Sequence, residues 1–329
     1  MSAGSGSRPR PSQWPVPVTA GRGAPRRPCA ATVALLGWVL LGLAGPVARA
    51  ETLTVATYNL ENYGAADRMT AAGYRQDYPK PEAEKQALRT VIAGLQADIL
   101  VLQEVGGRPY LEELRRDLQA GGVDYPHAYL LEAGDPDRHV AVLSRRPFLA
   151  VTPLAGLEFA YFGARERVKR GLLAVTVATA DGELTIFGLH LKSRFTDRRE
   201  DPLSAQRRLG EATAIRDAVL GRLPDPSTAR FLIMGDCNDG KAGPAVQRLL
   251  RRGKTEVARW LPAVDARGES WTYAYRKAET YSRVDQILAS PGLVASVRGG
   301  QARIYDGPGV AEASDHRPVV VTLELGRRP

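Results

Sequence analysis

Cysteine is scarce in this sequence: Cys29 and Cys237 are the only two among 329 residues. This scarcity excludes a disulfide-stapled scaffold and a metal centre built from several thiolates. There are also only four histidines, none of them paired at metal-ligand spacing. With 44% hydrophobic and 25% charged residues, the composition is that of a globular protein. A disordered, collagen-like or coiled-coil chain is therefore excluded.

The positive charge of the chain is concentrated near its start. The formal net charge is +9, but residues 1–50 carry six arginines and no acidic residue. The remaining residues hold 39 basic against 36 acidic groups, which is close to balance. The net charge therefore does not indicate that residues 51–329 bind nucleic acid.

Residues 1–50 have the pattern of a secretory signal peptide with a disordered basic start. Arg26 and Arg27 precede an apolar run of 15 residues, 30–44, and Ala48-Arg49-Ala50 supplies small residues at a cleavage point. The run is short for the ~20 apolar residues of a membrane span. We expect cleavage after Ala50 by the general or the twin-arginine export route, a secreted or periplasmic protein, and no stable membrane anchor. The alternative is an uncleaved anchor.

The remaining chain, 51–329, alternates strand and helix patterns without an internal repeat. Residues 80–97 place Leu88, Val91, Ile92 and Leu95 on one helical face. Helices are also predicted at 110–119 and at 205–220, the latter with Leu209, Ala212, Ile215 and Val219 facing inward. Strands are predicted at 53–57, 99–102, 140–143, 172–178, 184–189, 231–234, 271–275, 284–289 and 319–323. Hairpins mixed with strand–helix units favour one mixed-sheet α/β domain.

Polar side chains recur where apolar strands end. In sheet proteins such positions favour function, because a rigid strand places the side chain accurately. A single acidic residue after a strand is usually only solvated, but six such segments in one chain form a pattern. They are TYNLEN (Asn59, Glu61), LVLQEV (Glu104), FGLHLKS (His190), LIMGDCND (Asp236, Asn238), RVDQIL (Asp285) and SDHRPV (Asp315, His316).

These residue types point to metal-assisted phosphate chemistry. Carboxylate and amide oxygens suit Mg²⁺, or Mn²⁺ or Ca²⁺, better than Zn²⁺. Phosphoester hydrolysis needs a cation, donors to the phosphoryl oxygens and an activated water. Glu104 and Glu61 can supply the first, and Asn238 and His190 the second. Either Asp236 or His316 can activate the water, while Cys237 points away from its two neighbours and is predicted to be a buried apolar residue.

In this order, the motifs N-x-E, LQEV, GLHLKS, GDCND, RVDQI and SDHRPV resemble the endonuclease/exonuclease/phosphatase superfamily of DNase-I-like hydrolases. The resemblance implies a four-layer αββα sandwich of two packed mixed sheets, with the site at one end of the sheets. It further implies a metal site of Glu104, Glu61, Asn59 and Asp315, with Glu104 the main Mg²⁺ ligand. The implied catalytic residues are His190, Asp236, Asn238, Asp285 and His316, where Asp285 orients His316. Asn59, Asn238 and His190 are also implied to contact phosphate.

The substrate is predicted less directly. Arg170 and Lys192 adjoin core strands that would pair as a hairpin, so both are candidates for phosphate binding. Together with the export signal, they favour a secreted nuclease acting on DNA or RNA, with no protein partner implied. The alternatives are a phosphomonoesterase, a phospholipid or sphingomyelin phosphodiesterase, or a binding module without catalysis. Abasic-site endonucleases of the superfamily tend to have an amide where this chain has His190, which favours the other branches.

Overall fold

Two β-sheets form the centre of the fold. The structure is a computed structural model that describes residues 51–70, 72–196 and 198–326, so the predicted signal segment, 1–50, lies outside the described residues. The first sheet has the strand order β16 (Ala263–Val264), β20 (Ala302–Ile304), β21 (Val319–Leu325), β1 (Glu51–Tyr63), β4 (Ile99–Val105), β6 (His139–Ser144) and β5 (His127–Leu131). The second has the order β15 (Arg259–Trp260), β19 (Asp285–Ala289), β12 (Phe231–Asp236), β11 (Gly182–His190), β10 (Leu172–Thr179) and β7 (Phe148–Leu154).

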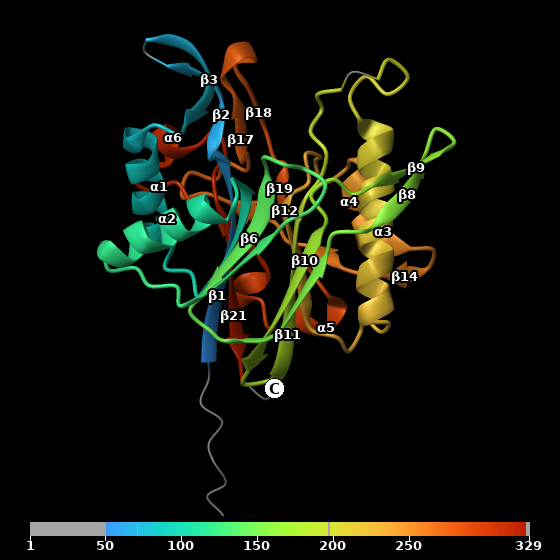
Figure 1. The fold of residues 1–329 in the computed structure, drawn as a ribbon. Helices are drawn as coiled ribbons and strands as arrows, with labels where there is room; N and C mark the ends of the chain where they lie inside the picture. Colours follow the sequence, from blue (N-terminus) through green and yellow to red (C-terminus); the bar gives the residue numbers. More distant parts are fainter. Residues whose placement is uncertain (1–50, 71, 197, 327–329) are drawn as a thin grey trace, which may run out of the picture. The chain divides into compact units, whose positions relative to one another are not determined.

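Both sheets mix parallel and antiparallel neighbours. Strand β1 is parallel to β4 and antiparallel to β21, while β11 is parallel to β12 and antiparallel to β10. The helices α1 (Glu82–Leu95) and α2 (Arg108–Ala120) lie outside the first sheet. The helices α3 (Ala205–Arg222) and α4 (Pro244–Leu250) lie outside the second (Figure 1). The predicted αββα sandwich is therefore confirmed.

Three apolar layers hold these four layers together. Between the sheets, residues such as Val55, Val101 and Ile186 are fully buried. The opposite faces of the same strands pack on the helices, for example Leu100 under α1 and Phe187 under α3. Because both faces of each central strand are buried, these strands are apolar without alternation.

Short helices and separate hairpins complete the fold. The helices are α5 (Pro291–Val294), α6 (Val310–Ala313) and the 3₁₀ turns η1 (Arg276–Ala278) and η2 (Arg298–Gly300). The two-stranded hairpins are β2 (Ala65–Thr70) with β3 (Gly73–Pro79), β8 (Glu158–Tyr161) with β9 (Ala164–Arg167), β13 (Arg251–Arg252) with β14 (Thr255–Glu256), and β17 (Tyr273–Tyr275) with β18 (Thr280–Ser282). None of the described helices is both long and apolar enough to cross a membrane.

The predicted elements are present, with small differences. The four apolar residues expected on one face of α1 are all buried. In α3 the expected inward residues Ala212, Ile215 and Val219 are buried, but Leu209 is only partly buried and Glu211 is fully buried instead. The strand expected at 271–275 is shorter, because β17 begins at Tyr273.

Candidate active site

The strands of both sheets bring the predicted residues to one end of the sandwich. His190 and Asp236 are the last residues of the parallel strands β11 and β12, and they are paired in register. Asp285 begins the neighbouring antiparallel strand β19 and is paired with Asp236. Asn59 and Glu104 come from the first sheet, where Asn59 lies in β1 and Glu104 in the adjacent strand β4. Residues distant in sequence therefore meet because strand ends meet.

The backbone is irregular where β1 and β4 carry these polar residues. The β1–β4 register shifts between Asn59 and Tyr63, which marks a bulge. Glu61 (φ 51°), Glu104 (φ 60°) and Asn238 (φ 48°) all adopt the left-handed conformation. This conformation is costly for residues other than glycine and collects at functional sites. All three of these residues belong to the predicted site.

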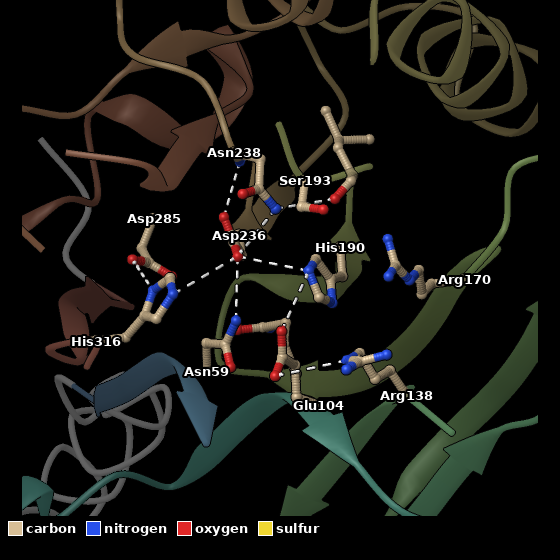
Figure 2. Close-up of polar contacts among 12 residues, drawn as sticks. Asn59, Glu104, Arg138, Arg170, His190, Ser193, Asp236, Asn238, Asp285 and His316 are labelled. Atoms are coloured by element: carbon tan, nitrogen blue, oxygen red, sulfur yellow. Dashed lines mark hydrogen bonds and ion pairs between the residues drawn. The ribbon is translucent and has the colours of Figure 1, made fainter. Parts of the chain in front are cut away.

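Asp236 lies at the centre of the polar contacts at this end of the sandwich (Figure 2). Its Oδ2 accepts hydrogen bonds from Asn59 Nδ2 at 3.0 Å and from Asn238 Nδ2 at 3.2 Å. The Asn238 backbone N–H donates to Oδ1 at 2.8 Å. The ring nitrogens His190 Nε2 and His316 Nε2 lie 3.5 and 3.9 Å from Oδ2. The carboxylate is thus surrounded by donors, although it is buried.

Burial governs the protonation of the acidic groups. It raises the pKa of Asp236 to about 7, against the opposing effect of His316 and with help from Asp285. Burial also raises the pKa of Asp315 to about 7, and the carboxylates of Glu61 and Glu104 add to the effect. Both groups therefore exchange protons near neutral pH, as acid–base chemistry requires.

His316 and Asp285 form a buried pair. His316 Nδ1 lies 2.8 Å from Asp285 Oδ2, and the Tyr273 ring lies against the imidazole with centroids 4.8 Å apart. Burial alone would lower the pKa of His316, but the charge and hydrogen bond of Asp285 raise it well above its usual value. His316 is therefore an imidazolium at neutral pH in this arrangement. Its Nε2 faces Asp236 and Asp315 at 3.9 Å from each.

His190 differs from His316 in charge. Burial and the nearby cations, Arg170 first among them, lower the pKa of His190 well below its usual value. Its Nε2 lies 3.9 Å from Glu104 Oε1, and its buried Nδ1 has no hydrogen-bond partner among the described residues. A neutral imidazole can donate from one nitrogen only. The two histidines of the site are thus suited to different tasks.

Glu61, Glu104 and Asp315 form a more open group of carboxylates beside this centre. Their side chains are 38%, 17% and 27% exposed, whereas that of Asp236 is 2% exposed. Glu61 Oε2 accepts from the Asp315 backbone N–H at 3.0 Å, and Glu104 Oε2 accepts from the Asn62 N–H at 3.0 Å. These bonds fix the carboxylates and leave other oxygens available to a ligand.

The two predicted basic residues are placed differently. Arg170 is buried and lies beside His190 (Figure 2). Its Nε lies 2.8 Å from Asp135 Oδ2. Lys192 turns its Nζ toward the Ser193 hydroxyl at 3.1 Å and the Phe195 carbonyl. Burial and Arg170 lower the pKa of Lys192 to about 8. Arg170 therefore influences the site through its own positive charge, whereas the Lys192 ammonium is engaged by Ser193 and Phe195.

Some residues at the site carried no signal in the sequence. Lys80 is buried and donates to the Glu61 carbonyl oxygen at 3.1 Å, and Arg138 Nε lies 3.9 Å from Glu104 Oε2. Neither follows an apolar strand, so the strand-end pattern misses both. Tyr273 follows the tryptophan of a WTY segment, but nothing in its spacing predicts contact with His316.

Two groups of side chains have donors suited to a cation. Asp236, Asp285 and His316 each offer one atom, all within 4.8 Å of one another, which makes this cluster a possible metal site. A histidine ligand must be neutral, however, and Asp285 favours the charged form of His316. Glu61, Glu104 and Asp315 offer only hard oxygens, and repulsion by Glu61 and Glu104 adds to the burial that raises the pKa of Asp315. A divalent oxygen-seeking cation would relieve that repulsion, so these residues fit such an ion.

Comparisons with known proteins agree with this geometry. The model of the endonuclease/exonuclease/phosphatase family matches residues 56–316. No curated protein sequence matches this chain closely enough to indicate a relationship.

Solved structures share the fold at low sequence identity. An endonuclease/exonuclease/phosphatase from Bacteroides vulgatus is 17% identical, with a TM-score of 0.58 over 84% of this chain and 99% of its own. Sphingomyelinase C from Streptomyces griseocarneus is 18% identical, with a TM-score of 0.59 over 83% and 99%. Truncated TDP2 from Caenorhabditis elegans is 16% identical, with a TM-score of 0.56 over 83% and 97%. At these identities the likeness concerns the fold alone.

Proposed function

Because this chain belongs to the endonuclease/exonuclease/phosphatase family of phosphoester hydrolases, we propose that it is a divalent-metal-dependent nuclease that hydrolyses phosphodiester bonds of DNA or RNA. One observation carries the proposal. The buried His316–Asp285 pair faces Asp236, and the open carboxylates Glu61, Glu104 and Asp315 lie next to this acid–base centre. Acid–base groups beside hard oxygen donors are what metal-assisted phosphoester hydrolysis requires.

Each residue of the centre has a proposed task. Asp236, with a pKa of about 7, accepts a proton from the attacking water. His316, as an imidazolium held by Asp285, donates a hydrogen bond to a phosphoryl oxygen and stabilises its negative charge. Asn238 and the neutral His190 donate to the remaining oxygens. In this assignment the base is Asp236 and not His316, because His316 is already protonated.

Glu104, Glu61, Asn59 and Asp315 are proposed to hold the metal ion. Mg²⁺ fits their hard oxygens, and Mn²⁺ or Ca²⁺ have the same preference. When bound, such an ion withdraws charge from the phosphoryl and leaving oxygens. The Asn59 amide has a second task, because its Nδ2 donates to Asp236 Oδ2 and holds this carboxylate in place.

A nucleic acid is the preferred substrate because two tyrosine-bearing hairpins adjoin the carboxylates. The β2–β3 hairpin starts beyond Tyr63 and returns at Lys80 beside Glu61, carrying the exposed Tyr74 and Tyr78. The β17–β18 hairpin carries the exposed Tyr281, and the Ala274 backbone N–H donates to the Asp315 carbonyl oxygen at 2.9 Å. Exposed aromatic rings stack on bases without regard to sequence. The proposed setting is secreted or periplasmic, after cleavage behind Ala50.

A comparison of substrates tests this proposal. Plasmid DNA, RNA, sphingomyelin and a phosphomonoester are offered to the purified protein with Mg²⁺. We expect hydrolysis of DNA or RNA, its loss in His316→Ala, and its retention in the matched control His127→Ala, whose histidine packs on Phe148 away from the site. Hydrolysis confined to sphingomyelin or to the phosphomonoester would refute the nuclease and leave a phosphoesterase. Ligand binding without hydrolysis of any substrate would indicate a binding module.

A further inference from the structure

A cavity of about 520 Å³ lies beside Asp315 and has no task in the chemistry above. It is lined by Trp271, Tyr281 and Arg276, by the segment before α6 and by residues of α6 itself. Ser314 and Asp315 also line it. The Ser314 hydroxyl donates to the Asn59 carbonyl oxygen at 2.9 Å, so the cavity wall and the catalytic centre share residues.

The tryptophan wall is rigid. Arg317 is 2% exposed, and its guanidinium carbon lies 3.5 Å from the centre of the Trp271 ring. Arg317 Nη1 donates to Asp265 Oδ2 at 2.7 Å, and Nε donates to the Trp271 carbonyl oxygen at 3.1 Å. Asp265 Oδ1 in turn accepts from the Glu269 backbone N–H at 2.9 Å. The indole is therefore held in place before any ligand arrives, which lowers the entropy cost of binding.

The tyrosine wall is open to a ligand. Tyr281 is 62% exposed, and its ring centre lies 4.8 Å from that of Trp271. A second hollow of about 670 Å³ adjoins the same two aromatic side chains and Arg267. An exposed ring backed by a fixed ring offers a stacking surface for a planar group.

The charges around the cavity select against a bare anion. Three arginines line it, Arg267, Arg276 and Arg317, but so do three acidic residues, Asp306, Glu312 and Asp315. The cations are also partly engaged, since Arg276 Nη2 donates to the Ala311 carbonyl oxygen at 2.8 Å and Arg317 pairs with Asp265. A neutral planar ring with both donors and acceptors can use both signs of charge, whereas a free phosphate cannot.

From these observations we propose that the Trp271–Tyr281 cavity binds a nucleobase of the substrate next to the phosphodiester that is hydrolysed. The proposal rests on the proposed nuclease function and deepens it, because it assigns the base next to the hydrolysed bond to one defined cavity. Tyr281 supplies the stacking face, Trp271 supports it, and the charged rim contacts the polar edge of the base.

The test compares Tyr281→Ala with Tyr275→Ala. Tyr275 is a 45% exposed tyrosine of the same hairpin that does not line the cavity, so it is a matched control. Hydrolysis of an oligonucleotide and of a baseless oligonucleotide of the same length gives each variant's preference for bases. We expect this preference to fall about 5- to 150-fold in Tyr281→Ala, the worth of stacking one base, and mainly through KM. It should stay unchanged in Tyr275→Ala, and Tyr281→Phe should retain it.

Binding without turnover separates this proposal from the nuclease function. Stacking of a base beside Trp271 should quench indole fluorescence when deoxyadenosine monophosphate is added. The quenching should weaken in Tyr281→Ala and persist in Tyr275→Ala. If quenching depends on Tyr281 but the protein cleaves no nucleic acid, the proposed base-binding cavity is supported and the proposed nuclease function is refuted. If wild type and Tyr281→Ala cleave nucleic acid with the same preference for bases, the base-binding cavity is refuted and the nuclease function is supported.

Discussion

Replacing Asp285 by asparagine should disable His316 without disturbing the fold. The change keeps the volume of a side chain that is fully buried and removes only its charge. Asp285 Oδ2 lies 2.8 Å from His316 Nδ1, and this carboxylate raises the pKa of His316 more than Asp236 and Asp315 do. An amide cannot stabilise the imidazolium in the same way, so the pKa of His316 would fall and less of its charged form would be present.

The distance between the Asp285 and His316 charges gives an upper limit for what this pair contributes. Two unit charges 2.8 Å apart attract each other by about 6 kcal/mol at an effective dielectric constant of about 20, which is a ceiling because burial opposes it. One preorganised donor to a developing oxyanion is typically worth about 10²–10³-fold in kcat. We therefore expect kcat to fall about 10²-fold in Asp285→Asn, in which His316 keeps its place but loses charge, and about 10³-fold in His316→Ala, which loses the donor altogether.

The assay is a double-mutant cycle on kcat at saturating Mg²⁺, with circular dichroism to verify folding. Asp181→Asn is the matched control, because Asp181 pairs with Arg230 at the β10–β11 turn, at the far end of these strands. The double variant should be little slower than His316→Ala, since the two residues act as one unit. Losses that multiply in the double variant would refute the reasoning and assign Asp285 another partner.

Further predictions concern the metal, the backbone and processing. Glu104→Gln should weaken Mg²⁺ affinity, measured by calorimetry, by about 10-fold or more, while the exposed Glu132→Gln should not. Because Asp315 has a pKa of about 7, protons compete with the metal for its carboxylate below this pH. Mg²⁺ should therefore raise Tm more at about pH 8 than at about pH 5.5, and equal shifts of Tm would contradict this. Gly235→Ala should lower the free energy of unfolding, measured in urea, by about 1–3 kcal/mol or more. Gly235 has φ 142°, and an added Cβ would lie 2.0 Å from the Leu189 carbonyl oxygen. Gly221→Ala is the control, because its Cβ would meet no atom within 4 Å. Intact-mass analysis of exported protein should find Glu51 at the amino terminus, and a mass that retains 30–44 would favour the anchor.

The central strands could be predicted because burial on both faces makes them apolar. Residues 99–102 and 231–234 show this, and both are core strands. The β2–β3 and β8–β9 hairpins could not be predicted. The strands of β2–β3 and strand β9 are largely exposed and pair only within their hairpins, so no hydrophobic periodicity marks them. Strand β8 has only four residues, too few for the alternation of its buried Phe159 and Tyr161 to mark a strand. Glu211 illustrates a second limit: it is buried because its Oε2 accepts the Lys192 backbone N–H at 2.7 Å, a partner that no local pattern reveals.

The candidate site could be located from sequence because its residues follow core strands. Asp236, Asp285 and His316 meet as expected from strand ends at one edge. Their charge states could not be predicted, because these depend on burial and on neighbours from other segments. Lys80 and Arg138 enter the site from a hairpin and a loop whose composition is ordinary. The Trp271–Tyr281 cavity likewise depends on the fold of the segment around Asp265.

Metal dependence tests the account most directly. The protein, stripped of metal, is assayed on plasmid DNA in excess EDTA, and again after Mg²⁺ is added beyond the EDTA, with Glu104→Gln alongside. The account predicts no hydrolysis in EDTA, full recovery with Mg²⁺, and recovery in Glu104→Gln only at a higher Mg²⁺ concentration. Undiminished hydrolysis in EDTA, or a Glu104→Gln variant with the wild-type Mg²⁺ requirement, would contradict it.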